Sequence, residues 1–93
     1  MSDHLESLRN EILHLDEELI RLIRIRMEKV REIARFKKEN SLPIRDDSRE
    51  ADVIAHILNQ PHEGIDSEKL TVLIHQLLEI SRDTQSKVFE SMD

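Results

Sequence analysis

The most constraining feature of this sequence is a long stripe of apolar residues in its first half. Its members recur at alternating steps of three and four residues: Leu5, Leu8, Ile12, Leu15, Leu19 and Leu22. This spacing predicts one continuous apolar face on a long α-helix. The next position of the stripe is Arg26, and Lys37 follows about three turns later, about 20° around the helix. A buried cation needs an anionic partner, so a ligand can supply the negative charge where the chain does not.

Two breaks, at Pro43 and at residues 60–64, divide the chain into three helical segments. No strand-like alternation appears in any of them. The sequence therefore predicts an all-α fold with one very long, one short and one medium helix, in a single domain of residues 1–93. The first expected helix covers about residues 3–40. The second begins after residues 41–45 and ends at Pro61, and the third runs from Asp66 or Ser67 almost to the C-terminus.

The long helix is too long for the rest of the chain to cover. Some 37 residues at ~1.5 Å per residue make a rod of about 55 Å, whereas a compact domain of this size has a radius of gyration near 13 Å. The two shorter helices cannot bury the whole apolar stripe. We therefore expect an intertwined homodimer in which two long helices pack antiparallel or cross.

Charge and composition exclude several classes of function. The net charge of −6 argues against general binding to nucleic acid or to an anionic membrane. Ten of the fourteen Lys and Arg residues lie between Arg21 and Arg49, a pattern that suits a small anion, although most of these bases are expected on a solvated helix face. There is no Cys, no apolar run of about 20 residues and no secretory signal pattern at the N-terminus, so we expect a cytoplasmic setting.

Arg26 and Lys37 are placed to meet one small ligand. They are separated by about 16 Å of helix rise on one face, and long side chains leaning together can both contact a molecule between them. Arg9 precedes Arg26 by about 25 Å and lies about 100° around the helix, so it cannot reach the same ligand within one chain. In a two-fold dimer with crossed long helices, Arg9 of one chain can lie near Arg26 of the other.

The start of the second helix offers further anion-binding groups. Free backbone N–H groups at a helix start favour anions or hydroxyl oxygens, and Arg49 adds a guanidinium for a carboxylate. Asp46 and Glu50 can accept a hydrogen bond from a ligand hydroxyl. The alternative interpretation is an ordinary capped helix start, with Asp47 and Glu50 as the capping box.

Ser81 and Gln85 interrupt the apolar stripe of the third helix, and Val88 resumes it. Their hydroxyl and amide are neutral groups suited to an oxygen-rich ligand, although such a pair can also be the exposed end of a stripe. No base accompanies Ser81, so nucleophilic catalysis is not expected. The five histidines lack metal-ligand spacing, no Gly-rich phosphate loop exists, and no aromatic platform is available for base stacking.

The joint spacing of these residues is more specific than any single motif. The pattern contains residues 8–12 (Leu-Arg-Asn-Glu-Ile) and 15–19 (Leu-Asp-Glu-Glu-Leu), then Arg26, Lys37, residues 42–46 (Leu-Pro-Ile-Arg-Asp), Arg49, Glu50, Ser81 and Gln85. Over almost the whole chain it resembles the all-helical (type II) chorismate mutases. The resemblance implies a dimer of three-helix chains with two equivalent sites that convert chorismate to prephenate, on the route to phenylalanine and tyrosine. It implies no metal and no cofactor.

The resemblance also implies a role for each residue of the pattern. The expected catalytic residues are Lys37, Gln85 and Arg26, with Lys37 and Gln85 donating to the ether oxygen of the substrate. All eight pattern residues would bind substrate: Arg9 from the partner chain, and Arg26, Lys37, Asp46, Arg49, Glu50, Ser81 and Gln85 from the other. The arginines would hold the two carboxylates with help from Ser81, and Glu50 with the backbone near Asp46 would hold the ring hydroxyl.

Two alternatives remain open from the sequence. The first is an isochorismate-pyruvate lyase, which shares this fold and a similar cationic pocket. The second is a non-catalytic helical dimerisation module, in which Arg26 and Lys37 pair with acids of the partner chain. Asn10, His75 and Arg82 lie beside the pattern and are given no role by it.

Overall fold

The computed structural model describes residues 2–91, and this part of the chain forms three α-helices. They are α1 (Ser2–Glu39), α2 (Asp47–Leu58) and α3 (Ser67–Ser91). The prediction of one very long, one short and one medium helix is therefore confirmed, with boundaries within a few residues of those expected. None of these helices is long and apolar enough to cross a membrane.

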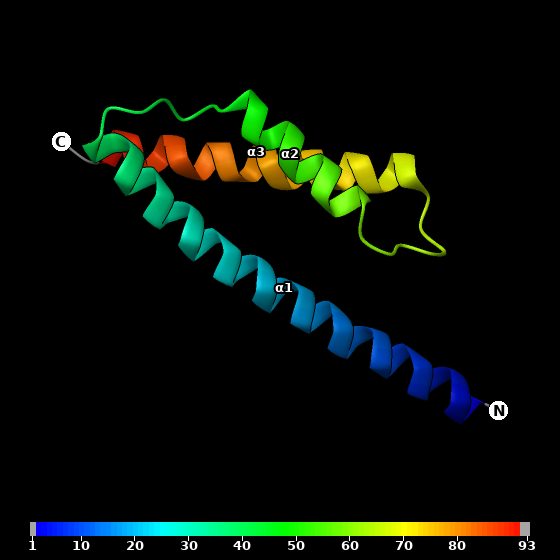
Figure 1. Ribbon diagram of the computed structural model, residues 1–93. Helices are drawn as coiled ribbons and strands as arrows, with labels where there is room; N and C mark the ends of the chain where they lie inside the picture. The colour runs from blue at the N-terminus through cyan, green and yellow to red at the C-terminus, as the bar shows by residue number, and fades with distance from the viewer. Residues whose placement is uncertain (1, 92–93) are drawn as a thin grey trace.

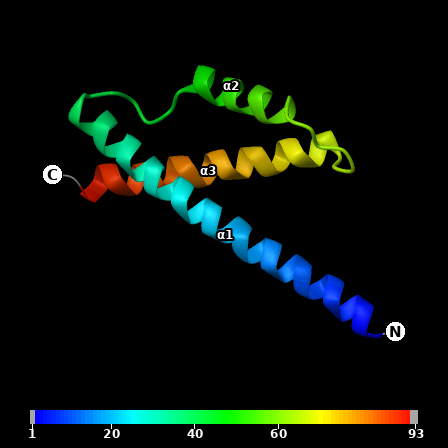
Figure 2. The same ribbon diagram turned by 60° about the horizontal axis from the view of Figure 1, so that its bottom comes forward.

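The three helices form a V with one long free arm (Figures 1 and 2). The C-terminal half of α1 packs against α3, and α2 lies along α3 in the opposite direction. The N-terminal half of α1 extends away from both. The described chain measures 59 × 26 × 15 Å, and its radius of gyration of 17.1 Å exceeds the value of about 13 Å expected for a compact domain of this length.

The core lies where α1 crosses α3. The buried apolar side chains are Val30 and Ala34 of α1 and Ile74 and Leu78 of α3, and these two helices pack on each other. Ala34 is 0% exposed, and a methyl group at this position lets the two backbones approach closely. Four buried apolar side chains among the described residues make a small core, so much of the apolar surface needs another molecule to cover it.

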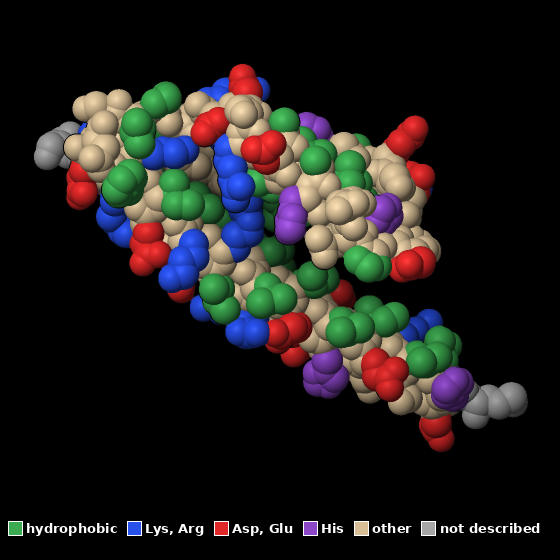
Figure 3. Space-filling model, viewed as in Figure 1, with side chains coloured by type: hydrophobic (Ala, Val, Ile, Leu, Met, Phe, Trp, Pro, Cys, Tyr) green, Lys and Arg blue, Asp and Glu red, His purple; other side chains and the backbone are tan. Residues whose placement is uncertain are grey.

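The apolar stripe of α1 remains uncovered along the free arm. Its side chains are exposed, with Leu15 reaching 64%, and Figure 3 shows apolar side chains gathered along this arm. This confirms that the two shorter helices do not bury the stripe. A contiguous apolar surface of this kind marks an interaction site rather than a solvated face.

A left-handed residue ends α1 and turns the chain toward the pocket. Ser41 has φ of +55°, its N–H donates to the carbonyl of Lys38, and the N–H of Leu42 donates to the carbonyl of Lys37. This pair of bonds is a Schellman cap, which usually carries glycine at the left-handed position. Pro43 follows and cannot continue the helix.

The cap of α2 lies one residue earlier than the sequence predicts. Asp46 is the N-cap, and its side chain accepts a hydrogen bond from the backbone N–H of Arg49. The expected capping box of Asp47 and Glu50 is wrong. Asp47 is already helical and accepts from Arg45, and Glu50 is turned toward α3, where Arg82 binds it.

Candidate active site

A pocket of about 310 Å³ lies between the three helices. The residues that line it come from α1, the segment before α2, α2 and α3: Arg26, Val30, Ile33, Lys37, Ile44, Asp46, Arg49, Glu50, Val53, Leu78, Ser81, Arg82 and Gln85. Seven of the eight predicted site residues are among them, and Arg9 is the exception. The fold thus brings together groups separated by up to 59 positions in the sequence.

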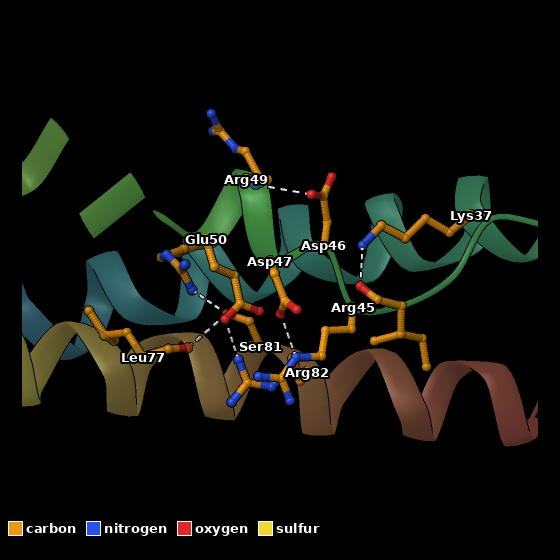
Figure 4. A network of polar contacts seen from close by, with 11 residues as sticks. Lys37, Arg45, Asp46, Asp47, Arg49, Glu50, Leu77, Ser81 and Arg82 are labelled. Carbon is orange, nitrogen blue, oxygen red and sulfur yellow. Dashed lines mark hydrogen bonds and ion pairs between the residues drawn. The ribbon is translucent and has the colours of Figure 1, made fainter. Parts of the chain in front are cut away.

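Lys37 is held at two points on the wall of the pocket. Its Nζ donates to the carbonyl oxygen of Ile44 at 2.7 Å and to Oε1 of Gln85 at 2.9 Å (Figure 4 draws the first of these bonds). An ammonium group has three N–H donors, and two of them are bonded within the described part of the chain, so the third can serve a ligand. The two anchors fix the direction of that donor before any ligand arrives.

The orientation of the Gln85 amide follows from its neighbour. Gln85 is 8% exposed, and its Oε1 accepts from Lys37. Because Lys37 can only donate, the oxygen of the amide must face it. The NH₂ group therefore remains available, and it makes no hydrogen bond with another side chain or backbone group of residues 2–91.

Ser81 connects Arg26 to the backbone of α3. The guanidinium of Arg26 donates to Oγ of Ser81 at 2.6 Å, and that hydroxyl donates to the carbonyl of Leu77 at 2.8 Å. The hydroxyl has a single proton, which the backbone takes, so its oxygen serves as an acceptor for Arg26. Ser81, which is 6% exposed, thereby fixes one corner of the guanidinium, whose other N–H donors make no hydrogen bond within residues 2–91.

Arg82 joins the pocket although sequence reasoning gave it no role. Its Nη1 lies 2.5 Å from Oε1 of Glu50, between α3 and α2 (Figure 4). Its position directly after Ser81 could have indicated a place near the site. That it contacts Glu50 follows only from the antiparallel packing of α2 on α3.

Asp46 and Arg49 lie at the border of the pocket. The Asp46 carboxylate caps α2 through Oδ1, which holds this side chain against the start of the helix. The side chain of Arg49 is exposed and points away from the contact network in Figure 4. It stands at the edge of the pocket, where a ligand or a second chain can reach it.

Arg9 lies far from the pocket of its own chain. It sits on the free arm of α1, where its Nη1 pairs with Oε1 of Glu6 at 3.0 Å and its side chain is 61% exposed. This placement agrees with the spacing argument that Arg9 cannot serve the site of its own chain. Its contribution to the site of a partner stays a prediction.

The electrostatics of the pocket favour an anion. Four cations line it against two carboxylates, and Figure 3 shows Lys and Arg side chains gathered where α1 approaches the other helices. Within residues 2–91, neither Arg26 nor Lys37 forms an ion pair. Two half-buried cations without carboxylate partners are best compensated by a ligand that brings two negative charges. The described residues contain no group of three or more His, Asp or Glu side chains placed to hold a metal ion.

Comparison with known proteins identifies the family. The family model described as "Chorismate mutase type II" matches residues 8–86. The chain belongs to the type II chorismate mutases. The crystal structure of chorismate mutase from Helicobacter pylori in complex with prephenate is similar, with a TM-score of 0.86 and 31% sequence identity over 96% of this chain and 97% of that chain. No curated protein matched in the corresponding search.

This membership confirms the resemblance drawn from the sequence. The type II chorismate mutases are isomerases that convert chorismate to prephenate, and this is the function of the chain. The matched range includes every predicted site residue. The all-helical fold of the family also agrees with the three helices of the structure.

Proposed function

We propose that the pocket between the three helices is the site of this rearrangement and that Arg9 of the partner subunit completes it. The observation that carries the proposal is the geometry of Lys37 and Gln85. Each is fixed by the other, and each keeps one donor group free beside the same pocket. The Helicobacter pylori relative was crystallised with prephenate, a compound with two carboxylates, which suits the cationic lining described above.

The reaction needs donors more than it needs a reactive side chain. The rearrangement of chorismate is intramolecular and breaks a C–O bond, so no nucleophile, proton shuttle or metal takes part. The enzyme accelerates it by holding the folded conformer and by stabilising the negative charge that grows on the ether oxygen. Lys37 and Gln85 supply two donors for that oxygen. One such donor is worth about 3–4 kcal/mol in a water-excluded site.

The carboxylates of the substrate are held by guanidinium groups. Arg26, fixed by Ser81, presents its remaining N–H donors to one carboxylate. Arg49 at the edge of the pocket and Arg9 of the partner subunit supply the others. Ser81 contributes through Arg26, because its own proton is bonded to the backbone.

The hydroxyl of the substrate ring requires an acceptor. Among residues 2–91, Glu50 bonds Arg82 through Oε1, and its other carboxylate oxygen makes no hydrogen bond. The backbone near Asp46 offers a further contact at the start of α2. The hydroxyl acceptor therefore lies on α2 and the principal donors lie on α1 and α3. All three helices would contact the substrate.

A second copy of the chain is the natural cover for the free arm of α1. The exposed stripe runs along the whole arm, and the same arm of a second copy would present an equal stripe of apolar side chains to it. In a two-fold arrangement, each arm carries its Arg9 away from its own pocket and toward that of the partner. The intertwined homodimer thus explains both the uncovered stripe and the distant arginine.

The test is an assay of the purified chain with chorismate and, separately, with isochorismate. We expect prephenate from chorismate and little pyruvate from isochorismate. A bicyclic diacid that mimics the folded conformer should inhibit the reaction and raise the thermal midpoint of the protein. Pyruvate release as the dominant activity would favour the lyase, and indifference to the diacid would favour a dimerisation module.

A further inference from the structure

Arg82 is a pocket residue to which the rearrangement itself assigns no task. It does not belong to the residue pattern of the sequence. It lines the pocket nonetheless, and its guanidinium is bonded to Glu50 at 2.5 Å. The two side chains are only 27% and 19% exposed, so the pair is partly withdrawn from water.

The charge of Glu50 is a difficulty for a pocket that binds a dianion. An uncompensated carboxylate in a partly desolvated site repels both carboxylates of the substrate. Arg82 lies close enough to cancel this charge, and the described structure pairs no other cation with Glu50. The bond therefore lets the pocket keep a strong hydroxyl acceptor without losing its affinity for an anion.

The same bond fixes the direction of Glu50. Arg82 follows Ser81 on α3, and Gln85 lies one turn further along this helix. Through these three residues α3 holds Glu50, Arg26 and Lys37 in turn. One helix thus sets the positions of three side chains that project from the two helices around it.

We propose that Arg82 is a positioning residue that acts through Glu50. It neutralises the carboxylate and holds Oε1, so that the other oxygen accepts a hydrogen bond from the ring hydroxyl of the substrate. This inference rests on the proposed function of the pocket. It assigns Arg82 no contact with the reacting atoms.

A double-mutant cycle with Arg82→Met and Glu50→Gln tests the proposal. Arg82→Met should raise KM for chorismate by about tenfold and change kcat less, because an unpaired carboxylate then opposes binding. In the Glu50→Gln background the same substitution should change KM by less than about threefold, since no charge is left to cancel. A role limited to holding α2 against α3 would not be rescued by Glu50→Gln.

Two further variants keep the result interpretable. Arg82→Lys retains the positive charge and should keep KM within about threefold of the wild type. It provides the test if Arg82→Met fails to fold, as judged by circular dichroism. Lys87→Met removes the same charge from an exposed position of α3 and should leave KM unchanged within about twofold.

The outcomes separate this inference from the function on which it rests. Equal losses from Arg82→Met in both backgrounds, an unchanged KM in Arg82→Met, or a tenfold loss in Arg82→Lys would each overturn the role of Arg82. The mutase activity of the wild type and its loss in Lys37→Ala report on the site itself. An active wild type with an additive cycle therefore refutes only the positioning role.

Discussion

Nζ of Lys37 and Oε1 of Gln85 lie 2.9 Å apart across the crossing of α1 and α3. This one bond joins the two helices that hold most of the buried core, and it orients both groups toward the pocket. The carbonyl of Ile44 takes a second donor of the ammonium at 2.7 Å. The donors that stabilise the ether oxygen are therefore arranged by folding, and little reorganisation is left for the reaction step.

Replacing Lys37 should abolish most of the activity without unfolding the chain. We expect Lys37→Ala to lower kcat by about 100- to 1,000-fold, the usual cost of removing one donor to a developing oxyanion. The measurement is the rate of chorismate consumption together with helicity by circular dichroism. Lys29→Ala is the control, because Lys29 is an exposed residue of α1 that pairs with Glu32 and lies outside the pocket lining. Near-normal turnover in Lys37→Ala would refute the assignment.

Gln85→Glu should make the activity depend on pH. A carboxylate at this position lies beside Lys37 and, once ionised, offers an acceptor where the ether oxygen needs a donor. Only the protonated form can donate, so activity should be lost as the pH rises through the pKa of the new carboxyl, ordinarily about 4.3. Rates are compared from acidic to neutral pH with those of Gln76→Glu, the same change at an exposed position of α3. A flat profile for Gln85→Glu would contradict the donor role.

Subunit mixing tests whether Arg9 serves the partner. Arg9→Ala and Arg26→Ala should each lose most of their activity as homodimers. In a mixed dimer, one site carries both substitutions and the other carries neither, so exchange of subunits should restore activity toward half of the wild-type value per dimer. Exchange is followed with two distinguishable tags. Absence of any recovery after proven exchange would rule out a site shared in this way.

The apolar arm should control assembly. Leu15→Glu places a charge on the exposed stripe, and we expect the dimer to dissociate and activity to fall with it. The lost burial amounts to about 1.5–3 kcal/mol for each chain, and the buried charge adds to it. Light scattering gives the oligomeric state. The control is His14→Glu, which places the same side chain on the neighbouring exposed position and should leave the dimer intact. If both variants had the same oligomeric state, the stripe would not be the interface.

The left-handed residue after α1 offers a gain in stability. Ser41→Gly should raise the free energy of unfolding by about 0.5–1 kcal/mol, because glycine adopts φ of +55° without the steric cost of a Cβ atom. Ser48→Gly, inside α2, should lower it by a similar amount. Thermal unfolding at fixed protein concentration measures both. A loss of stability in Ser41→Gly would mean that the Schellman cap contributes no strain.

The sequence was informative about local structure because helical periodicity is a local property. The stripe from Leu5 to Leu22 predicted a helix and its need for a partner surface, and the absence of any break before Pro43 predicted the length of α1. Pro43 was enough to predict where that helix stops. The cap of α2 was misplaced by one residue because Asp46 and Asp47 have the same chemistry, and the choice between them depends on the backbone angles at which the chain enters the helix.

What the sequence alone determined is therefore the set of helices, their apolar faces and the cations that interrupt them, since each follows from the spacing of residue types along one chain. Only the tertiary structure decided which groups meet. The bond between Arg82 and Glu50 depends on how α2 lies against α3. How these helices lie against α1 decides which donors of Lys37 and Ser81 are bonded to backbone carbonyls and which can meet a ligand. Such pairings are set by the angle and register of packed helices, which no spacing within a single helix encodes.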